Sequence, residues 1–240
     1  MPDLGLKVGA RRLMIENAPK IFFVSIVYIL IASVMSELEI RLPGTSAAYD
    51  LYLDRFFAGE FPSPMFFYSN LRSSGMALAA VLLLLEPVIS VGYLRYCMNI
   101  ARGKGGDYRD IFDGFLFFTK VVLIRIIITI LIFLWSLLLL FPAIPAYYRY
   151  RQAYYILLDA PEKSALQCIR ESKRIMDGNK LNLFLLDLSF IGWAILDLMV
   201  IVLFQFIIPF TLPIISIWLT PYLGVTRAAF YDRVIETIVV

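Results

Sequence analysis

The chain of 240 residues is 60% apolar and 15% aromatic, and only 17% of its residues are charged. A soluble domain averages about 45–50% apolar and about 25% charged residues, so this composition excludes an ordinary soluble domain and predicts a polytopic helical membrane protein. The net charge is only +3, and the sequence contains no histidine, which excludes imidazole bases and histidine-ligated metal sites.

The first half of the chain contains two apolar runs. Residues 1–20 form a basic amphipathic lead, and residues 21–35 form the first predicted crossing. Flanking residues must extend this crossing, because a membrane helix needs about 20 residues. Residues 37–75 are polar and rich in aromatic residues, so we expect an extracytoplasmic loop at the membrane interface. Residues 76–93 form the second predicted crossing.

Three further apolar runs and one ambiguous segment follow. The polar residues 94–120 lead into the third predicted crossing at 121–141. Residues 146–159 follow two prolines and are either a cytoplasmic extension or a short crossing buried among its neighbours. Residues 181–206 form a strong crossing, and the last one, at 207–229, is interrupted by three prolines.

Residues 162–178 have the pattern of an amphipathic helix, because apolar residues recur at helical spacing from Ala165 to Met176 and charged residues occupy most other positions. Two acids and a proline between 159 and 162 indicate its start, and a Gly-Asn pair at 178–179 suits a left-handed end. We expect this helix to lie on the cytoplasmic headgroups. Alternatively, it is a docking surface for a partner.

The distribution of basic residues predicts the topology. If residues 146–159 cross the membrane, 18 of the 22 lysine and arginine residues fall on one side, which the positive-inside rule makes cytoplasmic. We therefore predict an all-α bundle of about six membrane segments with proline-broken helices, a single transmembrane domain over 1–240 and both termini cytoplasmic. Five segments are the alternative. Cys97 and Cys168 fall in predicted cytoplasmic segments, so we expect reduced thiols.

Charged residues in or beside the membrane segments are the candidate ligand-binding residues, because such charges are costly and usually face a cavity or a partner. They are Glu86, Arg125, Arg149, Arg151, Asp187 and Asp197. We expect an Arg125–Asp187 pair, which either locks two helices or forms a substrate or proton site. Arg149 and Arg151 lie among tyrosines and either anchor the chain at the interface or hold a phosphate headgroup or an acidic ligand. Glu86 precedes Pro87, which frees a backbone carbonyl.

Two short segments of the sequence echo each other. Arg151-Gln-Ala-Tyr-Tyr follows one proline-containing segment, and Arg227-Ala-Ala-Phe-Tyr follows another. Such an echo indicates an internal repeat of membrane units. Coincidence between similar interfacial motifs explains it equally well.

The C-terminal part of the chain resembles a known family. The matching stretches lie within residues 133–232 and read FLWSLLLLFPAIPAYYRYRQAYYILLDAP, SALQCIRESKRIMDGNK, LFLLDLSFIGW and TPYLGVTRAAFY, while residues 92–118 fit more loosely. They resemble the bacterial membrane protein family catalogued as domain of unknown function nine-seven-five. The family pattern has Pro-Gly where this chain has Pro142-Ala143. A more distant likeness is to the membrane domain of some glycerophosphodiester phosphodiesterases.

The resemblance implies a multi-pass protein of the plasma membrane of a Gram-positive-type bacterium, and it supplies no activity. No acid–base or nucleophile arrangement points to catalysis, so we expect a protein that is not an enzyme, with no cofactor, no metal site and no nucleic-acid partner. We favour binding or transport of a small or lipid-like ligand through an intramembrane polar cavity. The alternative is a scaffold or regulatory subunit that docks a partner protein through residues 162–178, or that forms a homo-oligomer.

Overall fold

The computed structural model describes residues 3–138, 140–205 and 215–239. Over these residues the chain is built from helices and has no strand, so the predicted all-α class is confirmed. The helices are α1 (Asp3–Glu16), α2 (Lys20–Arg41), α3 (Thr45–Phe57), α4 (Pro64–Ser69), α5 (Ser73–Ala101), the 3₁₀ helix η1 (Tyr108–Phe117), α6 (Phe118–Leu138), α7 (Leu140–Tyr150), α8 (Ala153–Asp159), α9 (Ala165–Ile175), α10 (Lys180–Leu188), α11 (Ile191–Gln205) and α12 (Ser216–Val239).

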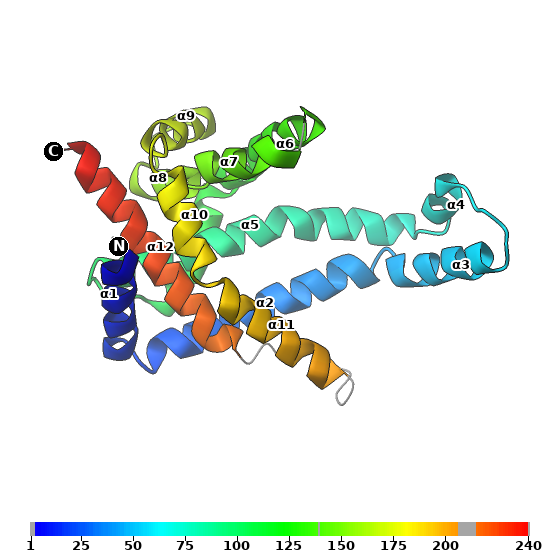
Figure 1. Cartoon of the computed structure of the whole chain (residues 1–240), viewed down its shortest axis with the longest axis horizontal. Coiled ribbons are helices and arrows are strands. Elements are labelled where there is room, and N and C mark those ends of the chain that lie inside the picture. Colours follow the sequence, from blue (N-terminus) through cyan, green and yellow to red (C-terminus); the bar gives the residue numbers. More distant parts are fainter. Residues whose placement is uncertain (1–2, 139, 206–214, 240) are drawn as a thin grey trace. The chain divides into compact units, whose positions relative to one another are not determined.

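The chain divides into two compact units, and the smaller one comprises residues 30–87. It contains the end of α2, the short helices α3 and α4, and the start of α5 (Figure 1). Gly44, with a positive φ of 72°, turns the chain into α3, and the Arg72 backbone N–H donates to the Pro43 carbonyl at 2.9 Å. The segment that we predicted as a loop is therefore largely helical.

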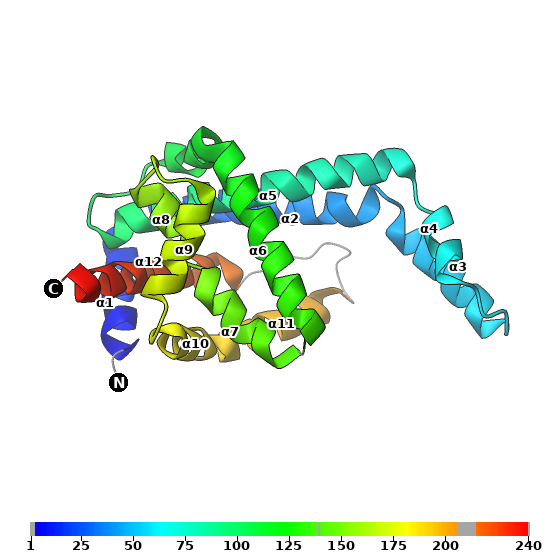
Figure 2. The same cartoon turned by 90° about the horizontal axis from the view of Figure 1, so that it is seen from above.

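The main unit comprises residues 1–29 and 88–240. In it α1 packs against α12, although the two helices lie at opposite ends of the sequence (Figures 1 and 2). The short helix α8 packs against α9, and α6 packs against α7. Helix α8 is almost entirely apolar, and its residues from Tyr155 to Leu158 are at most 4% exposed. It therefore forms part of the core of the main unit.

Helix α9 has the amphipathic pattern that the sequence predicts, but its start differs. Its N-cap is Ser164, which exchanges hydrogen bonds with Gln167 in a capping box, so the predicted start at 159–162 is wrong by several residues. The predicted left-handed glycine is confirmed, because Gly178 has a φ of 81°. The apolar face of α9 is covered by α8, α6 and α7 of the same chain and is therefore not available to lipid.

Three helical segments are long and apolar enough to cross a membrane, namely 20–41, 73–101 and 108–137. Helices α10 and α11, which meet at a bend of 41°, make a fourth if they are counted as one span. The chain is thus a helical membrane protein with three or four candidate spans among the residues described. Helix α8 has seven residues, about 10 Å of helix, which is too short to cross alone.

Three prolines of the predicted membrane segments lie inside helices. Helices α5, α7 and α12 contain Pro87, Pro145 and Pro221, respectively, and none of these helices ends there. Membrane helices tolerate proline because neighbouring groups satisfy the freed carbonyl. The predicted breaks at Pro145 and Pro221 are therefore not seen, whereas Pro87 lies inside a helix as expected, and the predictions for Pro209 and Pro213 lie outside the described residues.

Two glycines allow α5 and η1 to approach closely. A Cβ on Gly92 would lie 1.8 Å from the Ile111 carbonyl oxygen, and a Cβ on Gly114 would lie 1.9 Å from the Val88 carbonyl oxygen. Because any side chain at either position would collide with backbone, these glycines fix how the end of α5 packs against the segment that leads into α6.

An ion-pair network, here called the Arg102 cluster, joins three distant parts of the main unit. Arg102, just after α5, pairs with Asp159 at the end of α8 and with Asp232 in α12, each at 2.6 Å. Hydrogen bonds that Arg102 donates to Asp159 and to Asp232 raise the pKa of Arg102 above its ordinary value, so this guanidinium remains charged. The cluster therefore holds the ends of α5 and α8 against α12.

Candidate functional site

A cavity of about 370 Å³ lies within the main unit, between α5, α6, α12 and the junction of α7 with α8. Tyrosines and arginines dominate its polar lining among the described residues. They are Tyr28, Tyr93, Tyr147, Tyr154, Tyr155, Arg125, Arg151 and Arg227. The size is that of a small-molecule site, which typically has about 300–1,000 Å³.

A carboxylate beside this cavity binds two of its arginines, and we name this group the Asp187 cluster. Asp187 of α10 accepts from Arg151 Nη1 through Oδ2 at 2.5 Å and from Arg227 Nε through Oδ1 at 2.9 Å. The Tyr148 hydroxyl also donates to Oδ2, at 3.3 Å. The Asp187 side chain is only 12% exposed, and those of Arg151 and Arg227 are 17% and 26% exposed. The cluster thus places two positive charges and one negative charge at a largely buried position.

The fold supplies these groups from three separate elements. Arg151 lies in the turn between α7 and α8, where the chain changes direction after Tyr150, and Arg227 lies in the middle of α12. The guanidinium of Arg151 also lies over the ring of Tyr147, 5.1 Å from its centre. An aromatic face stabilises a cation at this distance, so the ring helps to fix the orientation of Arg151.

Apolar residues form another part of the lining. Leu94, Ile128, Ile132 and Leu223 face the cavity, and Gly224 lies beside them. Gly224 is required there because a Cβ would lie 2.6 Å from the Cys97 sulfur. The cavity lining therefore combines cationic and polar groups with apolar ones, which suits an amphiphilic ligand.

Hydroxyl groups form a third part of the lining. The rings of Tyr28 and Tyr93 stack with their centres 4.2 Å apart. The Tyr93 hydroxyl shares a hydrogen bond of 2.8 Å with Ser25, and the Tyr28 hydroxyl shares one of 3.2 Å with Ser90. These contacts orient the two rings at the side of the cavity formed by α2 and α5.

The two echoing sequence segments meet at the Asp187 cluster. Their first residues, Arg151 and Arg227, bind the two oxygens of one carboxylate. Their last residues, Tyr155 and Tyr231, stack with ring centres 5.0 Å apart. Equivalent positions of the two segments therefore contact each other or share a partner. Sequence reasoning missed Arg227 as a site residue, although this echo was the signal that could have identified it.

The structure brings together part of the predicted ligand-binding set. Arg125 and Arg151 line the cavity, and Asp187 contacts it through Arg151. Within the described residues Asp187 accepts hydrogen bonds from Tyr148, Arg151 and Arg227, and the expected Arg125–Asp187 pair is not among these contacts. Arg227, from the middle of α12, takes the expected place of Arg125, because the fold brings its guanidinium within hydrogen-bond distance of Asp187.

The other three predicted residues lie elsewhere. Arg149 is not among the cavity-lining residues, and its carbonyl accepts a hydrogen bond from Ser172 at 2.9 Å. Asp197 of α11 is 7% exposed and accepts a hydrogen bond from Ser216. Glu86 is half-buried in α5 and belongs to the smaller unit.

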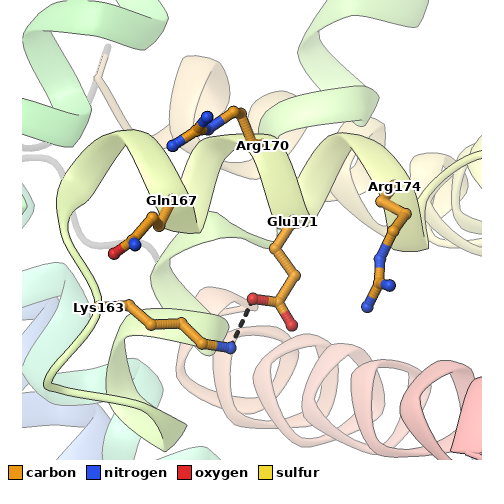
Figure 3. A pocket seen from close by; sticks show the side chains of 5 residues that line it. All are labelled: Lys163, Gln167, Arg170, Glu171 and Arg174. Carbon is orange, nitrogen blue, oxygen red and sulfur yellow. Dashed lines mark hydrogen bonds and ion pairs between the residues drawn. The ribbon is translucent and has the colours of Figure 1, made fainter.

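A second hollow, of about 390 Å³, lies on the polar face of α9 (Figure 3). Lys163 and Glu171 form an ion pair across it at 2.5 Å, and Arg174 lies beside Glu171. Gln167 and Arg170 complete its lining. This is a charged surface hollow, whereas the cavity at Arg151 lies between helices.

Comparison with known proteins finds a family that matches the C-terminal part of the chain. Residues 137–237 match the family described as protein of unknown function, DUF975. The DUF975 match confirms the resemblance predicted from the sequence, and it includes Arg151, Asp187 and Arg227, so the whole ion cluster lies within the matched region. The likeness to the membrane domain of glycerophosphodiester phosphodiesterases is not confirmed. No curated protein and no solved structure matches the chain.

Proposed function

We propose that this protein is a non-enzymatic, multi-pass protein of the bacterial plasma membrane that binds a small or lipid-like ligand in the cavity beside the Asp187 cluster. The observation that carries this proposal is the composition of the cavity lining, which contains arginines and tyrosines together with apolar residues from α5, α6 and α12. Charged groups inside a helical membrane protein are costly, and they usually line a pathway or a ligand site.

The polar groups of the cavity support binding rather than packing alone. An ion pair that only locked two helices would need one arginine for one carboxylate. Here two arginines from different elements share Asp187, and both also line the cavity. Binding is the first step of transport, and the proposal extends to transport if the cavity opens alternately to the two sides of the membrane.

Native mass spectrometry of the gently solubilised protein tests the proposal. Thr129 of α6 lines the cavity, whereas the next residue, Ile130, does not and is 52% exposed. We expect the wild-type protein to retain a bound small molecule or lipid, the cavity-filling variant Thr129→Trp to lose it, and the control Ile130→Trp to retain it. A wild-type protein without bound ligand, or equal retention by both variants, would count against a ligand cavity.

The charged face of α9 favours a second candidate function, in which the protein is a scaffold that holds a partner protein. Arg170 and Arg174 lie one helical turn apart on that face (Figure 3), and the apolar face of α9 is fixed against the core. A partner polypeptide that co-purifies with the wild type and is lost in Arg170→Glu/Arg174→Glu would support this function. The variant Lys173→Glu, at an exposed position outside the hollow, is the matched control.

A further inference from the structure

We propose that the ligand of the cavity carries a phosphate or carboxylate group, and that Arg151 and Arg227 bind this anion. The inference rests on the proposed function and names the chemistry of the ligand. Its source is either an anionic lipid headgroup or a water-soluble anion, because both present the same oxygens.

The charge at the site is the first support. Arg151 and Arg227 share a single carboxylate, Asp187, and their side chains are mostly shielded from solvent. One positive charge is therefore in excess at this position. Arg125 lines the same cavity, but the excess arises from Arg151 and Arg227 alone. A buried excess charge is costly, and an anionic ligand removes that cost.

The unused donors are the second support. A guanidinium has five N–H donors, and its planar fork fits two oxygens of a carboxylate or phosphate. Arg227 donates to Asp187 only through Nε, and Arg151 donates to it only through Nη1. Neither guanidinium donates to another acceptor within the described residues, although both line the cavity. Their remaining N–H groups are therefore available to an anion in the cavity.

The shape of the lining indicates where the rest of the ligand lies. Leu94, Ile128 and Ile132 come from α5 and α6, and they contribute apolar surface to the cavity that Arg151 and Arg227 also line. An acyl chain or another apolar group fits against them, while the anionic group contacts the arginines. An amphiphilic anion satisfies both the cationic and the apolar residues of the lining, whereas a cation would be repelled by the arginines.

The test measures binding of defined probes to the delipidated full-length protein by native mass spectrometry. The probes are dioleoylphosphatidylglycerol, which is anionic, and dioleoylphosphatidylcholine, which has the same acyl chains and no net charge. We expect the wild type to prefer the anionic lipid by about tenfold and Arg151→Gln and Arg227→Gln to lose this preference, because each removes one charge-assisted contact. The variant Arg170→Gln, on the surface of α9, is the charge-matched control and keeps the preference.

A second variant keeps the proposal testable if the arginine variants fail to fold. Asp187 competes with the ligand for both arginines, so Asp187→Asn increases the affinity for the anionic lipid several-fold. An affinity that is unchanged or lower in folded Asp187→Asn would overturn the proposal.

Inorganic phosphate distinguishes the two sources of the anion. The ligand is a water-soluble anion if two results are found together. Phosphate alone raises the melting temperature of the wild type but not that of Arg227→Gln, and the wild type shows no preference for the anionic lipid over the neutral one. Equal binding of both lipids, lost in Thr129→Trp but unchanged in Arg151→Gln and Arg227→Gln, would overturn the anion while the ligand cavity stands. If no probe binds in a manner sensitive to Thr129→Trp, the cavity itself is not a ligand site.

Discussion

The packing of α9 changes the chemistry of one side chain, that of Cys168. It lies on the buried face of α9 and is 0% exposed. Burial raises the pKa of the Cys168 thiol, because the thiolate would lose most of its solvation there. Nearby Lys163 lowers this pKa and Glu171 raises it, but burial dominates. The folded protein therefore holds Cys168 as a neutral, inaccessible thiol.

We predict that Cys168 in the folded protein reacts far more slowly with a thiol reagent than in the unfolded protein, measured at pH 8 in a Cys97→Ala variant. The raised pKa has a second consequence. Stability from the protonated thiol is fully present below the ordinary thiol pKa of about 8.5, and it is lost as the pH rises above that value. The melting temperature should therefore fall more steeply above pH 9 in this variant than in Cys97→Ala/Cys168→Ala. Rapid labelling at pH 8 would show that α9 leaves the core.

At the scale of elements, the contact between α5 and η1 depends on glycine. We predict that Gly92→Ala destabilises the protein by about 3 kcal/mol, because the new methyl group would overlap the Ile111 carbonyl and the two backbones would have to separate. Thermal unfolding in detergent, followed by circular dichroism, measures this change.

Gly9 of α1 is the matched control for Gly92. A Cβ on Gly9 would meet no atom within 4 Å, so Gly9→Ala should be neutral or stabilise the helix by about 0.5–1 kcal/mol. Similar melting temperatures for the two alanine variants would contradict the close approach of α5 and η1.

The positions of most helices could be predicted from the sequence, because long apolar runs and an amphipathic pattern are local signals. Their ends could not always be predicted. The start of α9 depends on whether Ser164 or an earlier acid caps the helix, and both choices satisfy local rules. The helices that continue through Pro145 and Pro221 also escaped prediction, because only tertiary packing shows whether a proline interrupts a membrane helix.

Less of the site could be predicted than of the helices. The sequence identified Arg125 and Arg151 because they are charges beside tyrosines or inside an apolar run. The partner of Asp187 could not be derived, because Arg151 and Arg227 lie 36 and 40 residues away from it in the sequence. Only the docking of α12 decides which arginine reaches that carboxylate, and docking is not a local property.

At the scale of the whole molecule, cysteine labelling tests the predicted topology of six membrane segments with both termini cytoplasmic. Cys168 is unsuitable as a label site, because its burial would prevent reaction on either side of the membrane. We therefore predict the outcome for single cysteines at exposed positions in a Cys97→Ala/Cys168→Ala background. An impermeant maleimide added to intact cells should label Glu60→Cys, whereas Lys173→Cys should react only after permeabilisation, because basic segments stay inside. External labelling of Lys173→Cys would contradict six segments with both termini cytoplasmic.

The packing of α1 against α12 has a consequence for the order of folding. The two helices are separated by about 200 residues of chain, so their contact closes one of the longest loops in the molecule. During synthesis α1 leaves the ribosome first, and its partner surface does not exist until α12 follows. The Arg102 cluster also waits for α12, which supplies Asp232. Completion of the main unit therefore waits until α12 has been synthesised, and until then α1 exposes Met14, which the finished fold buries.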